Sequence, residues 1–560
     1  MKSFLETEHR DLLAATLAVT LSLLGCSGSD GASHSGPGGA TGGSGNTGGT
    51  VGAGGTTVAG GATVAGGATV AGGATVAGGT TVVGGTTVAG GTTANGGVPS
   101  VGGGTRPFAG ATAASGDGTP VLLSSFDISK ISGTPGMRLG DINGDGKMEI
   151  VMGQPTDQSV LGAGTPQFVV CVTAFDLKGN QLWQYGTPGK FHSASSDIPI
   201  QVYDMDGDGK SEVFVAMDNK SITVLDGTKG TVKRTIPLPA AGSNDCIIFA
   251  NLRGNGWPQD IVVKDRYTTL WAITGIDDDS SKAGTLLWTH KGTTGHFPLV
   301  HDWDGDGKDE VMGGYDYLES DGTMQWSTDT TSTPKLTMHA DAIATADVDG
   351  NPANGYEIVV GGNHAAMFDW KTGKQYWQDN NTVENQQMGI GEYRSDSPGL
   401  EVVLLDRIGP RTAQGHDANV LLSSTDKLLW KESRTDYGWI TVTENMNNWL
   451  GDGTDLILSY HRGGQTPATL YDGKDNVIAQ FPHTGNLVDD AQHADLCGDG
   501  KEEVIVYNES MIWIFSNGKC DLDAAPAQPS IPQQFHLHNW SEYTGWITPD
   551  VRFYTPGSAQ

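Results

Sequence analysis

The sequence predicts an all-β fold, an eight-bladed β-propeller, and three observations point to it. An acidic loop signature, Asp-x-Asp-Gly-Asp-Gly or a degraded form of it, occurs eight times between Asp141 and Glu503. Successive copies begin about 45 to 65 residues apart, a period typical of propellers and other repeat arrays. Short apolar runs such as EIVMG and EVFVAM follow the loops and have the length and composition of buried strands. Eight blades of about 50 residues would fill residues 119–560.

The residues before the propeller carry export and tethering signals. The apolar stretch 12–25 is too short to span a bilayer. It ends in Leu23-Leu24-Gly25-Cys26, which resembles a bacterial lipobox with Cys26 as the lipidated residue, so residues 1–26 are predicted to be a lipoprotein signal. Residues 27–118 are rich in Gly and Thr and lack the large side chains of a core, so we expect a disordered linker. The predicted location is the cell envelope, as an outer-membrane or cell-surface lipoprotein, or otherwise outside the cell.

The best-preserved loops carry oxygen-bearing side chains at positions 1, 3 and 5 and glycine at position 6. Oxygens at this spacing wrap one hard cation, and glycine permits the sharp turn. An EF-hand would place helices around such a loop, whereas here strands follow it. We therefore expect structural Ca²⁺. The expected ligands are Asp141, Asn143, Asp145 and Glu149; Asp204, Asp206, Asp208 and Glu212; Asp302, Asp304, Asp306 and Glu310; and, in a lengthened loop, Asp347, Asp349 and Asn351.

The other four loops keep the frame of the repeat without its full ligand set. They are 251–260, 392–401, 448–455 and 495–503, and in the last of these Cys497 replaces the second ligand. Even numbers of cysteines in an exported protein suggest disulfides. Cys497 with Cys520 is the predicted pair, while Cys171 and Cys246 are either a second pair or free buried thiols.

The charge balance excludes one class of partner. Asp and Glu number 64 against 33 Lys and Arg, for a net charge of −31. The calcium loops themselves require many of these carboxylates. Because no basic stripe is present to release counterions, we expect no nucleic acid partner. An acidic substrate would need cations placed locally. We expect a monomer that contacts the membrane only through its lipid anchor.

Repeat geometry also predicts where a site would lie. The start of each inner strand and the end of the next strand fall on the face opposite the calcium loops. His, Tyr, Arg and Asp recur at these positions, and aromatic rings that suit sugar faces cluster late in the chain. A solvated propeller mouth can also hold such residues without function. The catalytic candidates are His296, His339, Asp341, Tyr437, Tyr460 and His493, and the substrate-binding candidates are Arg266, His364, Arg407, Arg434, Trp439 and Arg462.

The repeats resemble FG-GAP, integrin-type propellers, and two segments resemble a family of enzymes. GHFPLVHDWDGDGKDE, with His296, and HADAIATADVDG, with His339 and Asp341, are similar to segments of rhamnogalacturonan lyases of polysaccharide lyase family 11. The resemblance implies that these three residues help to hold an active-site cation beside the carboxylates of the substrate. An acidic ligand of the family is replaced by Arg407, and the family's Asn-Gly-x-Lys stretch is not evident before the last repeat. Ulvan lyases are similar in residue types.

The sequence therefore predicts a surface-anchored polysaccharide lyase acting on an acidic, rhamnogalacturonan-like polysaccharide. In β-elimination a cation or Arg neutralises the uronate, a base removes the C5 proton and an acid protonates the leaving oxygen. His and Tyr are the usual base and acid. The alternatives are an ulvan-type lyase, and a non-catalytic, calcium-dependent propeller that binds carbohydrate or protein.

Overall fold

The computed structural model describes residues 117–131, 136–156, 166, 168–189, 198–276, 282–337, 339–351, 353–408, 416–432, 442–460, 467–481 and 490–523. All of them belong to one compact unit, which comprises residues 1–29 and 100–560. Cys26, the linker up to residue 116 and the C-terminal residues 524–560 lie outside the described residues, so the predictions for them stay predictions.

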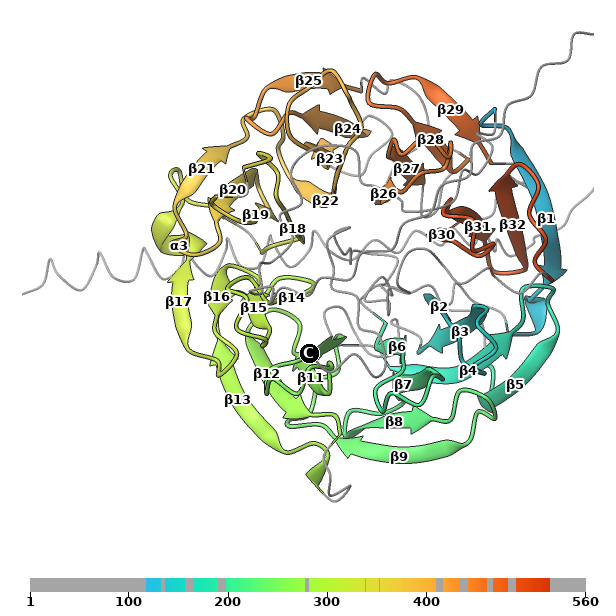
Figure 1. Ribbon diagram of the computed structural model, residues 1–560. Coiled ribbons are helices and arrows are strands. Elements are labelled where there is room, and N and C mark those ends of the chain that lie inside the picture. The colour runs from blue at the N-terminus through green and yellow to red at the C-terminus, as the bar shows by residue number, and fades with distance from the viewer. Residues whose placement is uncertain are drawn as a thin grey trace, which may run out of the picture. The chain divides into compact units, whose positions relative to one another are not determined.

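The described strands form eight four-stranded antiparallel sheets that follow one another around a ring, which confirms the eight-bladed β-propeller (Figure 1). The first four blades are β2 (Gly136–Gly140), β3 (Glu149–Pro155), β4 (Val169–Phe175) and β5 (Gln181–Gly186); β6 (Ile200–Tyr203), β7 (Glu212–Ala216), β8 (Ser221–Leu225) and β9 (Val232–Pro237); β10 (Ile247–Ala250), β11 (Asp260–Lys264), β12 (Thr269–Thr274) and β13 (Leu286–Lys291); and β14 (Leu299–His301), β15 (Glu310–Gly313), β16 (Asp316–Leu318) and β17 (Met324–Ser327).

The second half of the ring repeats this order from the innermost strand to the outermost. Its blades are β18 (Ala342–Ala346), β19 (Glu357–Gly361), β20 (Ala365–Asp369) and β21 (Gln375–Gln378); β22 (Asn385–Gly391), β23 (Glu401–Ile408), β24 (His416–Leu422) and β25 (Leu428–Lys431); β26 (Val442–Met446), β27 (Leu456–Tyr460), β28 (Thr469–Tyr471) and β29 (Val477–Gln480); and β30 (Asp490–Ala494), β31 (Glu503–Tyr507), β32 (Met511–Asn517) and β1 (Pro120–Asp127).

The N-terminal strand closes the ring. β1 is the outermost strand of the eighth blade and pairs antiparallel with β32, with Val121 opposite Ser516 and Phe126 opposite Ile512. The sequence also predicts that residues 535–546 lie across this closure, because a propeller needs its ends locked together, and that segment is outside the described residues. In the described part of the chain, helix is limited to η1 (Ser129–Ile131) and α3 (Thr328–Thr331). None of the described helices has the length and apolarity needed to cross a membrane.

Burial follows the position of a strand within its blade. Second strands such as β7 and β31 are buried at every residue, because neighbouring blades cover both of their faces. Outer strands alternate: in β13 the side chain of Trp288 is buried while its neighbours are exposed. These tryptophans join adjacent blades, as their indole nitrogens donate to backbone carbonyls of the next blade. The pairs are Trp183 with Gly227, Trp288 with Ser320, Trp326 with Trp370, Trp377 with Ser424 and Trp430 with Gly473.

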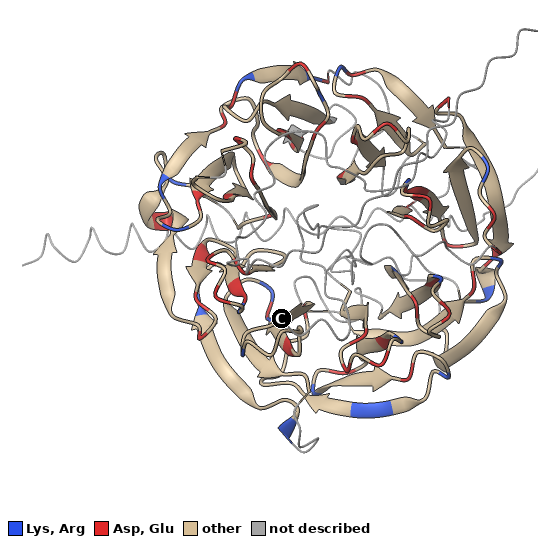
Figure 2. Cartoon of the chain, in the orientation of Figure 1, with Lys and Arg blue, Asp and Glu red and all other residues tan. Residues whose placement is uncertain are grey.

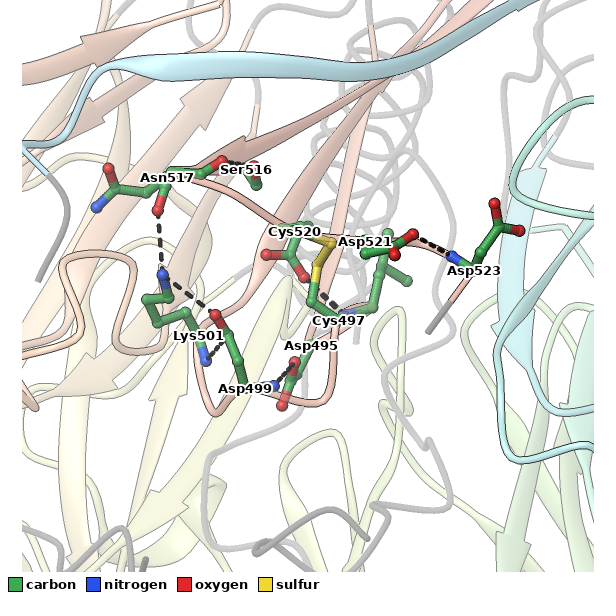
Figure 3. Close-up of a disulfide and its surroundings, with 12 residues drawn as sticks. Asp495, Cys497, Asp499, Lys501, Ser516, Asn517, Cys520, Asp521 and Asp523 are labelled. Carbon is green, nitrogen blue, oxygen red and sulfur yellow. Dashed lines mark hydrogen bonds and ion pairs between the residues drawn. A yellow bond between two sulfur atoms is a disulfide. The ribbon is translucent and has the colours of Figure 1, made fainter. Parts of the chain in front are cut away.

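Each acidic loop connects the first and second strands of its blade, the position that the repeat predicted. Figure 2 shows acidic residues spread around the ring, while basic residues are fewer and scattered. The eighth blade also contains the predicted disulfide: Cys497, in its acidic loop, is bonded to Cys520 after β32, with Cα atoms 5.8 Å apart (Figure 3). Cys171 and Cys246 are buried, and neither forms a disulfide with another described cysteine.

Candidate active site

The structure brings His296, His339 and Asp341 together in one cluster, which we call the histidine centre. His296 precedes β14, whereas His339 and Asp341 precede β18, so two neighbouring blades supply it. The Nε2 atoms of His339 and His296 lie 3.0 and 3.5 Å from Oδ1 of Asp341. The side chains of His296 and Asp341 are buried, while His339 keeps 18% of its side chain exposed. A small ligand could therefore reach the centre from the side of His339.

Backbone hydrogen bonds align the two segments of the histidine centre. The amide of His296 donates to the carbonyl of Ala340 at 3.0 Å, and the amide of Asp341 donates to the carbonyl of Gly361 at the same distance. Gly295 permits this close approach. Its φ is +63°, and a Cβ atom there would lie 2.3 Å from the carbonyl oxygen of Ala340. Only glycine fits both conditions.

Tyr267 extends the centre to a third blade. It lies on the turn between β11 and β12, and its ring centroid is 4.6 Å from that of His339 and 5.6 Å from that of His296. The two imidazoles are 5.0 Å apart. Sequence reasoning missed Tyr267, although it directly follows the polar run Lys264-Asp265-Arg266 at the end of a second strand. That position was the available signal.

Arg266, a predicted substrate ligand, makes internal contacts. Its guanidinium carbon lies 5.1 Å from the centroid of the Tyr267 ring, and Nη1 is 3.3 Å from Oδ1 of Asp245. Lys264, which is fully buried, also contacts Asp245 and donates to the carbonyls of Asp265 and Arg266, both at 3.0 Å. These contacts hold Arg266 beside the Tyr267 ring. Binding of substrate by Arg266 stays a prediction.

The surroundings keep His296 neutral. Burial lowers its pKa well below the ordinary value, and the nearby Arg266 lowers it further, against the opposing effect of Asp341. A neutral imidazole keeps a lone pair that can hold a cation or take a proton. Near the centre, burial also raises the pKa of Tyr315, whose hydroxyl donates to the carbonyl of Thr337 at 3.1 Å.

His364, another predicted substrate ligand, lies on the turn between β19 and β20. The same turn contacts the segment that leads to His339, because the amide of Thr337 donates to the side-chain oxygen of Asn363 at 2.6 Å. The amide of Gly362 donates to the carbonyl of His364 at 3.1 Å. The turn that carries His364 is therefore hydrogen-bonded to the segment that leads to His339. Contact of His364 with substrate stays a prediction.

Tyr460 and His493, both predicted as base or acid, lie in a second cluster between the seventh and eighth blades. The Tyr460 hydroxyl donates to Glu444 at 2.8 Å, and the two ring nitrogens of His493 lie 2.9 Å from Glu444 and Glu502. Burial lowers the pKa of His493, but Glu502 and Glu444 outweigh it and raise the pKa to about 10. A histidine with that pKa is already protonated at neutral pH, so it is a poor general base. We call these four residues the inter-blade cluster.

Several candidates lie beyond what the structure describes. Tyr437, Arg434, Trp439 and Arg462 are outside the described residues. The backbone of Arg407 belongs to β23, opposite Asp417 of β24, and its side chain is not described. The adjacent Asp406 is buried and structural: it lies 2.9 Å from Nζ of Lys431 and accepts the amide of Val383 at 2.6 Å.

The acidic loops share one bracing contact. The carboxylate that ends a loop accepts the amide of the second loop residue, as Glu310 does from Trp303 at 2.9 Å and Glu149 does from Ile142 at 3.0 Å. Carboxylates of three loops also converge to within 4.8 Å of one another. These groups are Asp204, Asp206 and Glu212; Asp302, Asp304, Asp306 and Glu310; and Asp347, Asp349 and Glu357. Sequence reasoning missed Glu357 because insertions displace it from its usual spacing.

An all-oxygen set of this kind fits calcium. The fit is best at Asp302, Asp304, Asp306 and Glu310. Burial, together with Asp304 and Asp302, raises the pKa of Glu310 to about 8, which reflects a site rich in negative charge. In the first loop, Nδ2 of Asn143 donates to Glu149 at 2.6 Å, and in the lengthened loop Nδ2 of Asn354 donates to Glu357 at 2.8 Å.

Comparison with known proteins points to one family. The model of the rhamnogalacturonan lyase family 11 C-terminal domain matches residues 132–235. Rhamnogalacturonan exolyase YesX of Bacillus subtilis (strain 168) is 24% identical over 459 residues, which cover 70% of each chain. The chain is a rhamnogalacturonan lyase-like propeller. Rhamnogalacturonan endolyase YesW of the same organism is 27% identical over 274 residues, or 38% of this chain and 42% of that protein.

The chain is also similar to solved structures. The crystal structure of YesW covers 76% of this chain and 79% of its own, with 20% identity and a TM-score of 0.49. The sequence similarity to the two Bacillus subtilis lyases and to the family model supports the conclusion that the chain is an enzyme of the polysaccharide lyase class. The segment matched by the family model spans the first two blades, whereas the histidine centre lies on the third to fifth.

Proposed function

We propose that this rhamnogalacturonan lyase-like propeller is a polysaccharide lyase that cleaves a uronate-containing, rhamnogalacturonan-like polysaccharide by β-elimination. The observation that carries the proposal is the histidine centre, in which two imidazoles converge on one buried carboxylate. The similarity to an exolyase and an endolyase supports the substrate class.

The histidine centre has the donors for a divalent cation. One nitrogen from each of His296 and His339 and one oxygen from Asp341 lie within 4.8 Å of one another. When bound, such a cation neutralises the substrate carboxylate and stabilises the enolate that forms as C5 is deprotonated. The neutral state of His296 leaves its ring nitrogen available as a ligand.

The residues of the histidine centre have distinct roles in orienting the imidazoles and in meeting the substrate. Asp341 fixes the orientation of the His339 ring through the 3.0 Å contact. His339 is the partly exposed member, so it is the side chain that faces an incoming sugar. Tyr267 packs against both imidazoles and holds them at a set distance from each other. A His339 ring oriented by Asp341 can act either as a cation ligand or as the base.

The test is the ultraviolet absorbance of the unsaturated uronate, which only elimination produces. The full chain is incubated with rhamnogalacturonan and, separately, with ulvan, in calcium-containing buffer. We expect product with rhamnogalacturonan and a loss of at least about 100-fold in His339→Ala, typical of a lost acid–base or metal ligand. His301→Asn is the control, because His301 is a buried histidine of the neighbouring fourth blade that ends β14, away from the histidine centre.

The assay separates the candidates. Product from ulvan alone would favour an ulvan-type lyase. Binding of either polysaccharide without any absorbance change, by a chain with an intact melting transition, would overturn the lyase proposal and favour a calcium-dependent binding propeller. Full activity in His339→Ala would leave a lyase but move its site away from the histidine centre.

We also propose two features that support this activity from outside the centre. Acidic loops of the ring bind structural Ca²⁺, and this is best supported in the fourth blade by the converging carboxylates of Asp302, Asp304, Asp306 and Glu310. Lipidation of Cys26 anchors the enzyme at the cell surface, supported by the sequence Leu23-Leu24-Gly25-Cys26. Labelling with a radioactive fatty acid tests the anchor, because Cys26→Ser should abolish incorporation.

A further inference from the structure

We propose that two acidic loops are closed by cations of the chain itself, Lys233 in the second blade and Arg253 in the third, and that these loops take no calcium. The second-blade loop has an intact signature, Asp204-Met-Asp-Gly-Asp-Gly, and by sequence it is among the best calcium loops of the chain. The structure places a lysine ammonium among the carboxylates that would bind its ion. The inference goes beyond the proposed function, since it concerns which loops of the ring need a metal.

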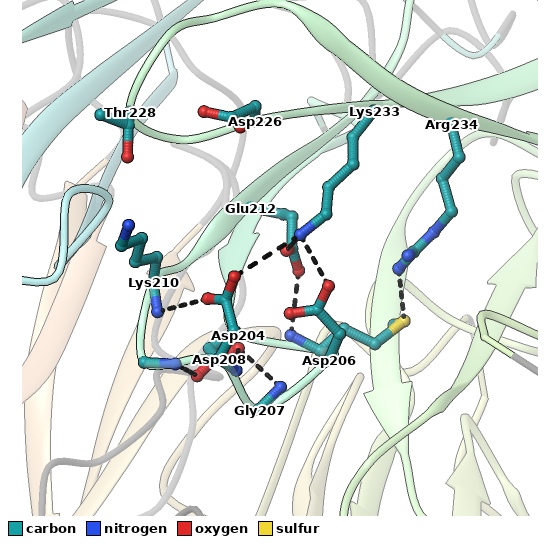
Figure 4. Close-up of polar contacts among 12 residues, drawn as sticks. Asp204, Asp206, Gly207, Asp208, Lys210, Glu212, Asp226, Thr228, Lys233 and Arg234 are labelled. Atoms are coloured by element: carbon teal, nitrogen blue, oxygen red, sulfur yellow. Dashed lines mark hydrogen bonds and ion pairs between the residues drawn. The ribbon is translucent and has the colours of Figure 1, made fainter.

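Lys233 reaches the loop from the outermost strand of the same blade, β9. Its ammonium lies 2.6 Å from Oδ2 of Asp206, contacts Oε1 of Glu212, and lies 4.0 Å from Oδ2 of Asp208 (Figure 4). These carboxylates come from loop positions 3, 5 and 9. The ammonium is thus surrounded by the oxygens that a calcium ion would coordinate at about 2.3 to 2.6 Å. Two cations cannot share that place.

The backbone explains why Lys233 points into the loop. The pairing of β8 with β9 shifts by one residue, so that Leu225 lies opposite Val232 and Val224 opposite Arg234, and Lys233 is the extra, bulged residue. A bulge re-aims the side chain that it contains. The same shift recurs in other blades, where the bulged residue is Leu182, Leu287 or Gln325. None of those side chains carries a positive charge, so the second blade differs from these three at this position.

In the third blade the positive charge comes from a residue of the loop itself. Arg253 occupies loop position 3, where the signature has an acidic ligand. Its Nε donates to Oδ1 of Asp260 at 2.7 Å, its amide donates to Oδ2 at 3.1 Å, and Nη2 donates to the carbonyl of Ile276 at 2.8 Å. Asp260 is the loop-ending carboxylate that corresponds to Glu212. The guanidinium therefore neutralises the acid that a metal would otherwise balance.

The fourth-blade loop provides the contrast. Lys308 is its basic residue, yet its stem lies against Gly254 of the third blade's loop, and its ammonium remains 3.8 Å from Asp306 at the exposed edge. Asp302, Asp304 and Glu310 converge beside it. In the eighth blade, position 3 is Cys497, which is bonded to Cys520. Loops of one repeat are thus closed by an internal cation or by a disulfide, and we assign calcium to the fourth-blade loop and not to the second.

The experiment counts calcium ions per chain by native mass spectrometry of the full-length protein after equilibration with excess calcium. Asp304→Asn should bind one ion fewer than wild type, whereas Asp206→Asn should bind the same number as wild type. Lys233→Met, which opens the second-blade loop, should bind one ion more. Arg253→Asp, which restores an acidic ligand at position 3, should also gain one. Lys229→Met is the control, because Lys229 is an exposed lysine of the same blade that pairs with Asp226 outside the loop.

The outcomes separate this inference from the calcium proposal. One ion fewer in Asp206→Asn, or an unchanged count in Lys233→Met, would overturn the inference. If Asp206→Asn fails to fold, the Lys233→Met count decides alone. If wild type binds no calcium at all, the proposal for the other loops fails, and a gain of one ion in Lys233→Met would still show that the lysine takes the place of the metal.

Discussion

Replacing His493 by Gln should strongly destabilise the propeller. The imidazole joins Glu444 of β26 to Glu502 in the acidic loop of the eighth blade, with both contacts at 2.9 Å. Removing one partner of a buried charged pair costs about 3 to 5 kcal/mol, because the remaining charge is left uncompensated. Two hydrogen bonds to charged groups, at about 1.5 to 3 kcal/mol each, lead to the same range. We therefore expect the free energy of unfolding to fall by about 3 kcal/mol or more.

The same substitution should change the pH dependence of stability. The pKa of His493 is raised to about 10 in the folded protein, against about 6.5 in an unfolded chain. Protonation of this group therefore stabilises the fold fully below about pH 6.5, and the contribution is lost as the pH rises through about 10. Between these limits the loss is about 1.4 kcal/mol per pH unit for one proton. The stability difference between wild type and H493Q should accordingly shrink from pH 7 to pH 9.

Urea unfolding at both pH values, followed by tryptophan fluorescence, measures this difference. Glu502→Gln is a matched comparison, because it removes one of the two charges that hold the imidazole while its amide oxygen can still accept from the amide of Asn447, now 2.7 Å from Glu502. The free energy of unfolding should fall less in Glu502→Gln than in H493Q. A difference between wild type and H493Q that is the same at pH 7 and pH 9, or smaller than about 1 kcal/mol at pH 7, would refute the charged-cluster interpretation.

Three further predictions concern other parts of the ring. Chelation of divalent cations should lower the melting temperature, since an ion bound only by the folded state stabilises it, and an unchanged calorimetric scan would contradict calcium in the acidic loops. Gly295→Ala should cost about 1 to 3 kcal/mol through its positive φ and the contact with Ala340, and should reduce lyase turnover; wild-type turnover would show that the two segments need no close approach. Trp326→Phe leaves the carbonyl of Trp370 without its 2.8 Å donor and should lower unfolding free energy by about 1 to 3 kcal/mol, measured in urea, while turnover stays unchanged.

The repeat made most of the fold predictable. A loop at the same place in each blade defines the inner and second strands, and therefore which face holds the polar ends. The strand that closes the ring was not predictable in this way, because β1 precedes the first acidic loop and carries no part of the signature. Its partner, β32, follows the last loop by an ordinary strand spacing. The pairing of β1 with β32 joins the two ends of the sequence, and no local pattern records it.

The site was predictable only where it depends on position in the repeat. His296, His339 and Asp341 were selected by their distance from a loop, and the structure brings them together. Tyr460 satisfied the same rule at the end of a second strand, yet its hydroxyl donates to Glu444 in the inter-blade cluster, where His493 of β30 also contacts Glu444. Alternation along a strand decides which side of a blade a side chain faces. The spacing of the repeat does not show whether a given side chain points to the centre of the ring or to the neighbouring blade. A polar residue at a strand end can therefore belong either to a site at the centre of the ring or to the packing between blades.

The signature of an acidic loop does not establish a metal, for a related reason. Ligands within a loop are adjacent in sequence, but the positive charge that balances them can come from a different strand of the blade. Lys233 of β9 is such a charge, because its ammonium contacts Asp206 and Glu212. The free energy of the loop depends on the sum of both contributions, because carboxylates at this spacing repel one another unless some cation lies between them. A chain can therefore lose its metal at one blade by gaining a lysine at a bulge, with no change in the loop itself. We therefore propose that dependence on calcium is confined to the blades whose loops kept only acids.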